Sequence, residues 1–427
     1  MNVFSSKDKA YPEALAEVCN RAARQHAKIE TRVKRILKNV ERNGDAAVAR
    51  YVKKFDGLAL SPKKFLVSSK EIRQAYASLP RADLQALQFA ARRIRAFHRK
   101  QRVSTWVSEE KGVKLGQLIT PLEVVGLYVP GGKALYPSTV LMNAIPAKVA
   151  GVPRVVMCSP TSSGAVDPCL LVAADLAGVD EVYRVGGVQA IGALAYGTKQ
   201  IPRADKIVGP GNMYVAAAKR AVYGTVDIDM VAGPSELLVI ADESADPAHC
   251  AADLLCEAEH DEEARVYLVT TSTAFAKKVA REIRNQLPKL TRRHIAAYSV
   301  GRYAKIFVVS NLDEAFDVAN AIAPEHLEVL LPRPFDYVKK IRHAGAVFMG
   351  AHTPPAVADY VAGPNHVLPT GGSARFFSAL SLDDYIKRTN VVAYTQAQLK
   401  VVTPYVTRLA AMEGLQAHAR SIESRGS

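Results

Sequence analysis

The 427-residue chain has few cysteines and no long apolar run. No apolar segment reaches the ~20 residues that a membrane-spanning helix needs, so a membrane protein is not expected. The N-terminal segment carries acidic residues early and has no apolar stretch of signal-peptide type, which disfavours secretion and organelle import. The five cysteines form no Cys-x-x-Cys pair, and we expect reduced thiols in a cytoplasmic protein.

Sequence features typical of nucleic-acid binding are also missing, although the chain is basic. The formal net charge is +15, and the segment Arg92–Arg102 holds six cations and no acid. Its basic residues recur around apolar positions at helical spacing, as on a solvated helix face. No zinc-finger, RNA-recognition or arginine-rich-tail pattern accompanies them. We therefore expect no nucleic-acid partner, and a basic surface that helps to gather an anionic dinucleotide is compatible with the charge.

Low-complexity tracts and repeats of 20–50 residues are absent, which argues against a repeat protein. From about residue 115 onward, strand-like runs alternate with helix-like ones, and this predicts parallel sheets covered by helices. The first 115 residues and the segment Thr403–Ser424 look mostly helical. The predicted strands are Glu123–Val129, Arg154–Cys158, Glu181–Val185, Lys206–Val208, Glu236–Ala241, Arg265–Thr270, Lys305–Val309, His326–Leu331 and Ala346–Met349. We expect two α/β units, one between about 129 and 236 and one assembled from the segments on either side of it.

Glycine-containing loops follow three of these strands, each just before a probable helix. They are Tyr128-Val-Pro-Gly-Gly132, Gly186-Gly-Val-Gln189 and Gly209-Pro-Gly-Asn212. Such turns present backbone N–H groups at helix N-termini, where a pyrophosphate binds well. None has the Gly-x-Gly-x-x-Gly spacing of a standard dinucleotide site, and each alone could be a simple tight turn. Three loops at corresponding strand ends favour a ligand-binding edge.

A first candidate site lies on a helix predicted over 246–260, which Asp246 can cap and Pro247 can begin. Glu257 and His260 are three residues apart, so their side chains project from the same face. A carboxylate beside an imidazole suits zinc or another borderline divalent ion. Cys256 is a rival ligand or nucleophile. The alternative is a solvated acidic helix end.

A second candidate site lies where Pro324 stops a helix over roughly Leu312–Ile322. Glu325 and His326 follow at the helix-to-strand junction, where side chains can be aimed into a cleft. Adjacent residues of an extended backbone point in opposite directions, so we expect that the two do not bind one metal ion together. A proton-accepting histidine and a water-activating carboxylate are the better use of them. The alternative is a surface pair with no role.

Taken together, several motifs resemble the histidinol dehydrogenase family over roughly residue 25 to the C-terminus. They are Ile207–Tyr214, Ile228–Glu236 followed by Glu257-Ala-Glu-His260, Ala323–Val329, Gly363–Thr370, and Glu413-Gly-Leu-x-Ala-His418. The resemblance implies oxidation of L-histidinol through the aldehyde to L-histidine, the last step of histidine biosynthesis, with two NAD and zinc.

We expect the following domain plan. The fold would be two parallel-sheet, incomplete Rossmann-like α/β domains with helical N- and C-terminal extensions. The expected ranges are 1–24 for the N-terminal extension, 25–128 with 237–380 for the first domain, 129–236 for the second, cofactor-side domain, and 381–427 for the C-terminal tail.

Residue roles follow from the same motifs. The metal ligands would be Glu257, His260, Asp359 and His418, and the catalytic pair would be Glu325 and His326. Tyr128, Gln189 and Asn212 would meet NAD. The substrate would be surrounded by Ser235, Glu257, His260, His326, Asp359, His366, Glu413 and His418. The chain would form a homodimer in which the tail carrying Glu413 and His418 completes the partner's active site.

Two departures from the family pattern keep other functions open. Glu257 stands where the family usually has glutamine, and Pro355 stands where it usually has an acid. A second carboxylate beside Asp359 would bind a dication more strongly and weaken its pull on the substrate. A paralogue that oxidises another polar alcohol, such as sulfopropanediol, is one alternative, and a non-catalytic dinucleotide-binding protein is another. Glu413 and His418 argue for histidinol.

Overall fold

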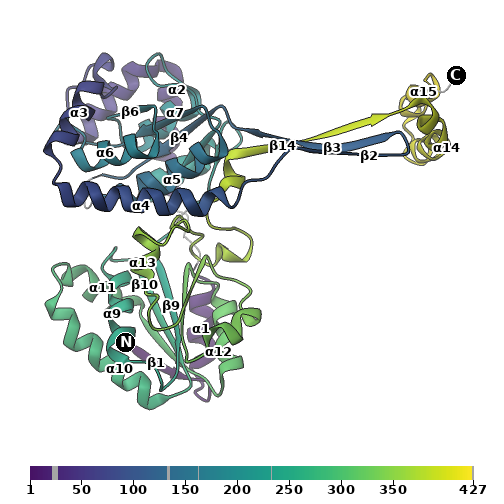
Figure 1. Ribbon diagram of the computed structural model, residues 1–427. Helices are drawn as coiled ribbons and strands as arrows, with labels where there is room; N and C mark the ends of the chain where they lie inside the picture. The colour runs from purple at the N-terminus through teal and green to yellow at the C-terminus, as the bar shows by residue number, and fades with distance from the viewer. Residues whose placement is uncertain (22–26, 132–134, 162, 232, 426–427) are drawn as a thin grey trace.

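The computed structural model describes residues 1–21, 27–131, 135–161, 163–231 and 233–425. Figure 1 shows two α/β bodies, one above the other, and a long arm that leaves the upper body and ends in two helices. No helix in these ranges is long and apolar enough to cross a membrane.

The lower body, which we call the six-stranded domain, comprises residues 1–21 and 233–380. Its sheet is wholly parallel, in the order β1-β11-β10-β9-β12-β13. The strands are β1 (Asn2–Ser5), β9 (Glu236–Ala241), β10 (Arg265–Thr270), β11 (Lys305–Val308), β12 (His326–Leu330) and β13 (Ala346–Met349). Helices α9 (Pro247–Ala258), α10 (Thr273–Gln286) and α11 (Arg293–Tyr303) cover one face, and α1 (Tyr11–Cys19) and α12 (Leu312–Ile322) cover the other.

Strand β9 explains why this sheet is buried on both sides. Leu237 and Val239 pack with α9 and α10, whereas Leu238 and Ile240 pack with α1 and α12. Successive side chains of a strand point to opposite faces, so a strand covered on both faces reads as a continuous apolar run.

The upper body, which we call the five-stranded domain, comprises residues 27–99 and 122–231. Its parallel sheet has the order β6-β5-β4-β7-β8. The strands are β4 (Val124–Tyr128), β5 (Arg154–Cys158), β6 (Glu181–Tyr183), β7 (Lys206–Val208) and β8 (Asp227–Ile228). One face is covered by α3 (Ser69–Ser78), α4 (Arg81–Arg99), α5 (Pro137–Ala150) and α6 (Pro168–Ala177), and the other by α2 (Ala27–Asp56), α7 (Gly187–Tyr196) and α8 (Met213–Val222).

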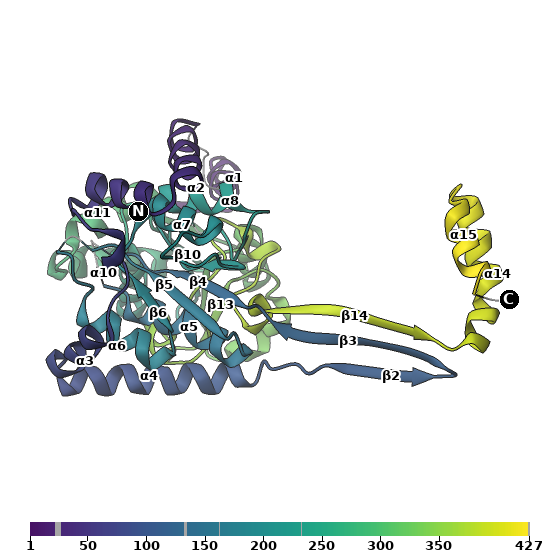
Figure 2. The ribbon, with the colours of Figure 1, turned by 90° about the horizontal axis from the view of Figure 1, so that it is seen from above.

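The arm is a three-stranded antiparallel sheet in the order β14-β3-β2, and Figure 2 shows it extending away from both domains. Its strands are β2 (Trp106–Glu110), β3 (Val113–Pro121) and β14 (Ile386–Tyr394), and its tip carries α14 (Gln396–Met412) and α15 (Gln416–Glu423). Among the described residues of these two helices, only Ala410 is buried.

Short elements complete the chain. They are α13 (Pro355–Tyr360) and the 3₁₀ helices η1 (Pro62–Lys64), η2 (Leu287–Lys289), η3 (Pro334–Lys340), η4 (Ser373–Arg375) and η5 (Leu382–Tyr385).

The prediction of two parallel α/β sheets is confirmed, and each of the nine predicted strands is present within a residue or two. The predicted domain ranges are wrong in three places. Helices α2 to α4 and strand β4, within 25–128, belong with the five-stranded sheet rather than with 237–380. The segment 1–24 contributes strand β1, and 381–427 contributes β14, so neither extension is purely helical. An apolar helix face shows that the helix is covered, but not which sheet covers it.

Candidate active site

The catalytic candidates Glu325 and His326 lie at the amino end of β12, beside the amino end of β9, in the six-stranded domain. His326 begins β12 and pairs with Leu237 of β9. Ala323, at the end of α12, has a left-handed backbone (φ 50°, ψ 65°), and its N–H donates to the Ala319 carbonyl at 2.8 Å. This turn, followed by Pro324, ends the helix and brings the chain directly into the strand. The predicted helix-to-strand junction is therefore confirmed.

The imidazole of His326 is oriented by the backbone of Glu236. Nδ1 lies 3.0 Å from the Glu236 carbonyl oxygen, and because a carbonyl only accepts, Nδ1 must be the protonated nitrogen. In the neutral form of the ring, Nε2 then carries the lone pair. It is buried without a hydrogen-bond partner among the described residues and lies 4.0 Å from Oδ1 of Asp359. A buried, unpaired imidazole nitrogen is the atom that a proton acceptor needs.

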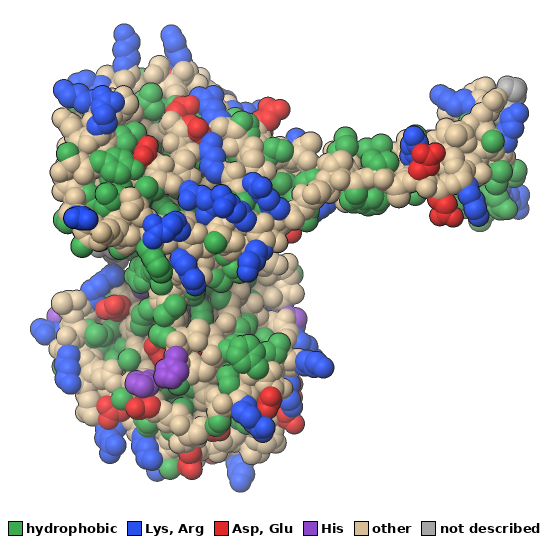
Figure 3. Space-filling view, viewed as in Figure 1, with side chains coloured by type: hydrophobic (Ala, Val, Ile, Leu, Met, Phe, Trp, Pro, Cys, Tyr) green, Lys and Arg blue, Asp and Glu red, His purple; other side chains and the backbone are tan. Residues whose placement is uncertain are grey.

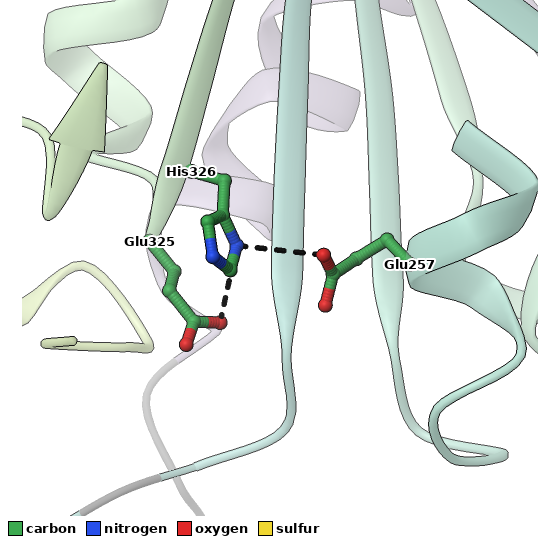
Figure 4. A group of neighbouring side chains, drawn as sticks. All are labelled: Glu257, Glu325 and His326. Carbon is green, nitrogen blue, oxygen red and sulfur yellow. Dashed lines mark ion pairs between the residues drawn. The ribbon is translucent and has the colours of Figure 1, made fainter. Parts of the chain in front are cut away.

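The carboxylate of Glu325 is fixed by the same backbone unit. Its Oε2 accepts the Glu236 N–H at 2.8 Å and lies 3.8 Å from Nδ1 of His326 (Figure 4). Burial, and then the charge of Glu257, hold the pKa of Glu325 well above its usual range. The expectation that Glu325 and His326 point apart is wrong. Glu325 precedes the first residue of β12, so the alternation of a regular strand does not constrain it.

Helix α9 supplies the second half of the site. Asp246 caps it by accepting the Ala248 N–H, and Pro247 occupies its first position, as the sequence predicts. Glu257 is 2% exposed; its Oε1 lies 3.2 Å from Nδ1 of His260 and its Oε2 lies 3.4 Å from Nδ1 of His326. The predicted common face of Glu257 and His260 is therefore present.

The pKa values of Glu257 and His260 are shifted as expected for a buried carboxylate beside two imidazoles. Burial would raise the pKa of Glu257, but the neighbouring His326 and His260 lower it to about 2. The bond to Glu257 raises the pKa of His260 to about 9. Cys256 is different: burial, and then the charge of Glu257, raise its pKa to about 12, so it is a protonated thiol at neutral pH. A thiol in that state is a poor nucleophile or ligand.

Two overlapping residue sets could hold a divalent metal. Three of the four predicted ligands, Glu257, His260 and Asp359, face this pocket. Within the described ranges, one cluster has potential ligand atoms all within 4.8 Å of one another, and it consists of Glu257, Glu325 and His326 (Figure 4). In that cluster, however, the backbone of Glu236 already binds Glu325 Oε2 and His326 Nδ1. Buried carboxylates with imidazole suit zinc.

Residues from the loop after β13 and from the five-stranded domain close the pocket. Nδ1 of His366 donates to the Asp359 carbonyl (2.9 Å), and its Nε2 lies 3.4 Å from Oγ1 of Thr139 in α5. Burial lowers the pKa of His366 to about 4, so the ring is neutral at physiological pH. The side chain of Ser235 contributes to lowering the pKa of Glu257. The pocket thus lies where the two domains meet.

The predicted cofactor residues share the carboxyl edge of the five-stranded sheet. Tyr128 ends β4, and its hydroxyl accepts the Gly187 N–H at 3.1 Å. Gln189 is 1% exposed, and neither polar atom of its amide has a hydrogen-bond partner in the described part of the chain. Asn212 caps α8 after β7. Gly209 has φ 107°, and a Cβ there would lie 2.2 Å from the Tyr128 carbonyl oxygen, so glycine is required. Gly132 of the predicted loops lies outside the described residues.

Among the predicted metal-binding and substrate-binding residues, Glu413 and His418 do not reach the pocket around His326. Both are exposed, and both lie at the tip of the arm, far from the six-stranded domain (Figures 1 and 2).

The chain matches the sequence profile described as histidinol dehydrogenase over residues 19–426. It belongs to the histidinol dehydrogenase family. It is similar to a histidinol dehydrogenase of Syntrophotalea carbinolica, with 50% identity over 426 residues that cover 100% of this chain and 99% of that one. It is 49% identical to one of Bacillus cereus, covering 97% of each. The crystal structure of histidinol dehydrogenase from Elizabethkingia anophelis superposes with a TM-score of 0.94 at 36% identity, covering 100% of this chain and 98% of that one.

The departure at Pro355 falls at the start of the helix that carries Asp359. Pro355 occupies the first position of α13, where a missing N–H costs no hydrogen bond. Asp359 lies one turn later on the same helix. Arg21 and Glu236 also contribute to the pocket, although no pattern in the sequence indicates a role for either residue.

Proposed function

We propose that this chain is an NAD- and zinc-dependent histidinol dehydrogenase that oxidises L-histidinol through L-histidinal to L-histidine, the last step of histidine biosynthesis. The observation that carries the proposal is the buried imidazole of His326, whose unpaired Nε2 lies 4.0 Å from Asp359 and whose Nδ1 lies 3.4 Å from Glu257. The choice of L-histidinol as the substrate is supported by membership of the histidinol dehydrogenase family.

The first half-reaction needs a proton acceptor. Nε2 of His326 takes the hydroxyl proton while a hydride leaves the carbinol carbon for the nicotinamide, giving the aldehyde and NADH. The Nδ1–H bond to the Glu236 carbonyl oxygen keeps the ring in the tautomer that accepts at Nε2.

The second half-reaction needs water. Glu325 takes a proton from a water molecule that adds to the aldehyde, and the hydrate then gives its hydride to a second NAD. Burial and the charge of Glu257 raise the pKa of Glu325, which makes its carboxylate a stronger proton acceptor.

Zinc would be held by Glu257, His260 and Asp359, with His418 from a second copy of the chain. When bound, the ion would anchor the imidazole and amine of the substrate and polarise its hydroxyl. The unpaired amide of Gln189, the hydroxyl of Tyr128 and the α8 N-terminus beside Asn212 would bind NAD.

The shape of the arm supports a homodimer. Figure 3 shows hydrophobic side chains along the arm and at its tip. Val401, Tyr405, Leu409 and Met412 of α14 are 58–73% exposed, an apolar surface of the kind that marks a protein interface. We therefore assign Glu413 and His418 to the partner's active site.

The five thiols are free, which fits a cytoplasmic enzyme.

The shared site can be tested by subunit exchange. Inactive His260→Ala and inactive His418→Ala proteins are mixed, and heterodimers are isolated through two different affinity tags. A heterodimer has one site with both histidines intact, so about half of the wild-type activity should return. Isolated heterodimers without activity would mean that each site is built within one chain.

Substrate identity can be tested by comparing kcat/KM for NADH formation with L-histidinol and with 2,3-dihydroxypropane-1-sulfonate. Histidinol should be preferred by orders of magnitude, because a hydrogen-bonding site rejects an analogue that leaves its polar groups unpaired. Preference for the sulfonate would establish the paralogue that oxidises another alcohol. NAD binding without turnover of either alcohol would establish a non-catalytic protein.

A further inference from the structure

The side chain of Arg21 is buried at the back of the catalytic pair. It is 2% exposed, and its partner Glu236 is 1% exposed. Nε and Nη2 donate to the two carboxylate oxygens of Glu236, both at 2.5 Å. Nη1 donates to the carbonyls of Ile322 (2.8 Å) and Val18 (3.0 Å). We call this arrangement the Arg21–Glu236 clamp.

Stability alone is a weak reason for such a clamp. Removing two charges from water costs about as much as their attraction returns, so a well-packed apolar pair of similar size is often as stable. What a bidentate guanidinium–carboxylate pair does supply is a fixed geometry, because both groups are planar and joined by two parallel bonds.

On one side, the clamp fixes Glu236, the residue whose backbone binds both catalytic candidates. The N–H of Glu236 donates to Oε2 of Glu325 (2.8 Å), and the carbonyl of Glu236 accepts from Nδ1 of His326 (3.0 Å). One peptide segment at the start of β9 thus orients the proton acceptor and the water-activating carboxylate, and the clamp orients that segment.

On the other side, Arg21 holds the turn that leads into the catalytic pair. Nη1 binds the Ile322 carbonyl, and Nη2 lies 3.4 Å from the Ala323 carbonyl oxygen. Ala323 has a left-handed backbone, which is unfavourable for a residue with a Cβ and persists only where the surroundings enforce it. Arg21 is therefore bonded to both segments that set the positions of Glu325 and His326.

We propose that Arg21 is a positioning residue of the active site: through Glu236 and the 322–323 carbonyls, it holds Glu325 and His326 in their reactive geometry. The inference rests on the catalytic roles proposed for those two residues. Arg21 directly follows the N-terminal segment whose helix α1 packs on the six-stranded domain, so it connects this segment with the active site.

The kinetic test uses the zinc-loaded full-length protein and the variants Arg21→Ala and Arg21→Lys. Arg21→Ala should lower kcat by about 10²-fold, as expected for a displacement of about 1 Å at the reacting groups, with KM for histidinol changed much less. Lysine keeps the positive charge but cannot form the bidentate contact with Glu236. Arg21→Lys should therefore fold normally and lose an intermediate amount of kcat. Guanidinium chloride below denaturing concentrations should restore part of the kcat of Arg21→Ala, a gain that general destabilisation cannot produce.

Lys148→Met is the matched control. Lys148 also binds two backbone carbonyls, those of Val152 and Pro153, and one carboxylate, that of Asp180, but at the amino end of the five-stranded sheet. It should lower thermal stability and leave kcat unchanged. If Arg21→Ala keeps wild-type kcat, or if its loss is matched by Lys148→Met, the positioning role is wrong.

A crystal structure of Arg21→Lys gives a readout that does not depend on the substrate. The contacts of Glu236 with Glu325 (2.8 Å) and His326 (3.0 Å) should lengthen or break while the rest of the sheet stays in place. Unchanged contacts would overturn the proposal. Wild-type protein that forms no NADH from histidinol would instead refute the proposed function, and this structural comparison would still decide the role of Arg21.

Discussion

Replacing Glu325 by glutamine should separate the two oxidations. Oε2 of Glu325 accepts the Glu236 N–H at 2.8 Å, and the amide oxygen of glutamine can accept the same bond. The side chain is almost fully buried and keeps its size, so the fold and the ring of His326 should be preserved. What is lost is the ability to take a proton from water, which only the aldehyde-to-acid step requires.

The size of the effect follows from the chemistry lost. Removing a general base typically slows a step by about 10²–10⁴-fold. At about 1.4 kcal/mol per factor of ten, this raises the barrier of the second oxidation by about 3–5 kcal/mol. The first oxidation uses His326 and should change less than about tenfold, the margin left for the lost negative charge beside the ring.

The assay is stopped-flow formation of NADH from histidinol and, separately, from histidinal. In Glu325→Gln, the reaction from histidinal should show the full loss, and the reaction from histidinol should give a burst of one NADH before slow turnover. The matched control, His326→Asn, should slow both reactions. Normal oxidation of histidinal by Glu325→Gln would refute the assignment of Glu325 as the water-activating base.

Further predictions concern the metal, the thiol and pH. His260→Ala should lose tightly held zinc, measured as metal per subunit after gel filtration, and Glu257→Gln should keep substantial activity with weaker zinc binding. Cys256→Ser should leave zinc content and turnover nearly unchanged, and a large loss of either would make the thiol a ligand or nucleophile. The pKa of His366 falls to about 4 in the folded protein, whereas an unfolded histidine titrates near 6.5. The unfolded chain therefore binds more protons between these values, and the stability from the neutral ring is lost as pH falls from about 6.5 to 4. In urea unfolding, His366→Gln should lose less stability than wild type over that window, and equal losses would contradict the shifted pKa.

The buried sheets were predictable from the sequence because strands that are covered on both faces consist of continuous apolar runs. Strand β9 is covered on both faces and reads as the apolar run Leu-Leu-Val-Ile-Ala after Glu236. Strand β2 has five exposed residues, so no alternation distinguishes it from a loop. The arm was missed for this reason, and with it the strand β14 that separates the C-terminal helices from the domains.

Those parts of the site that lie within one helix could be predicted from the sequence. Glu257 and His260 face the same way because a helix brings residues three apart together, and this needs no knowledge of the rest of the fold. Glu325 was misjudged because its orientation depends on the Glu236 N–H, 89 residues away. Arg21 and Glu236 are 215 residues apart, and no spacing within one element could have joined them.

The most direct test of the central claim is the stoichiometry of the reaction. Purified, zinc-loaded protein with excess NAD should form two NADH for each L-histidinol consumed, with L-histidine as the product and no free histidinal. One NADH per histidinol with histidinal released, or no NADH at all, would contradict a four-electron histidinol dehydrogenase.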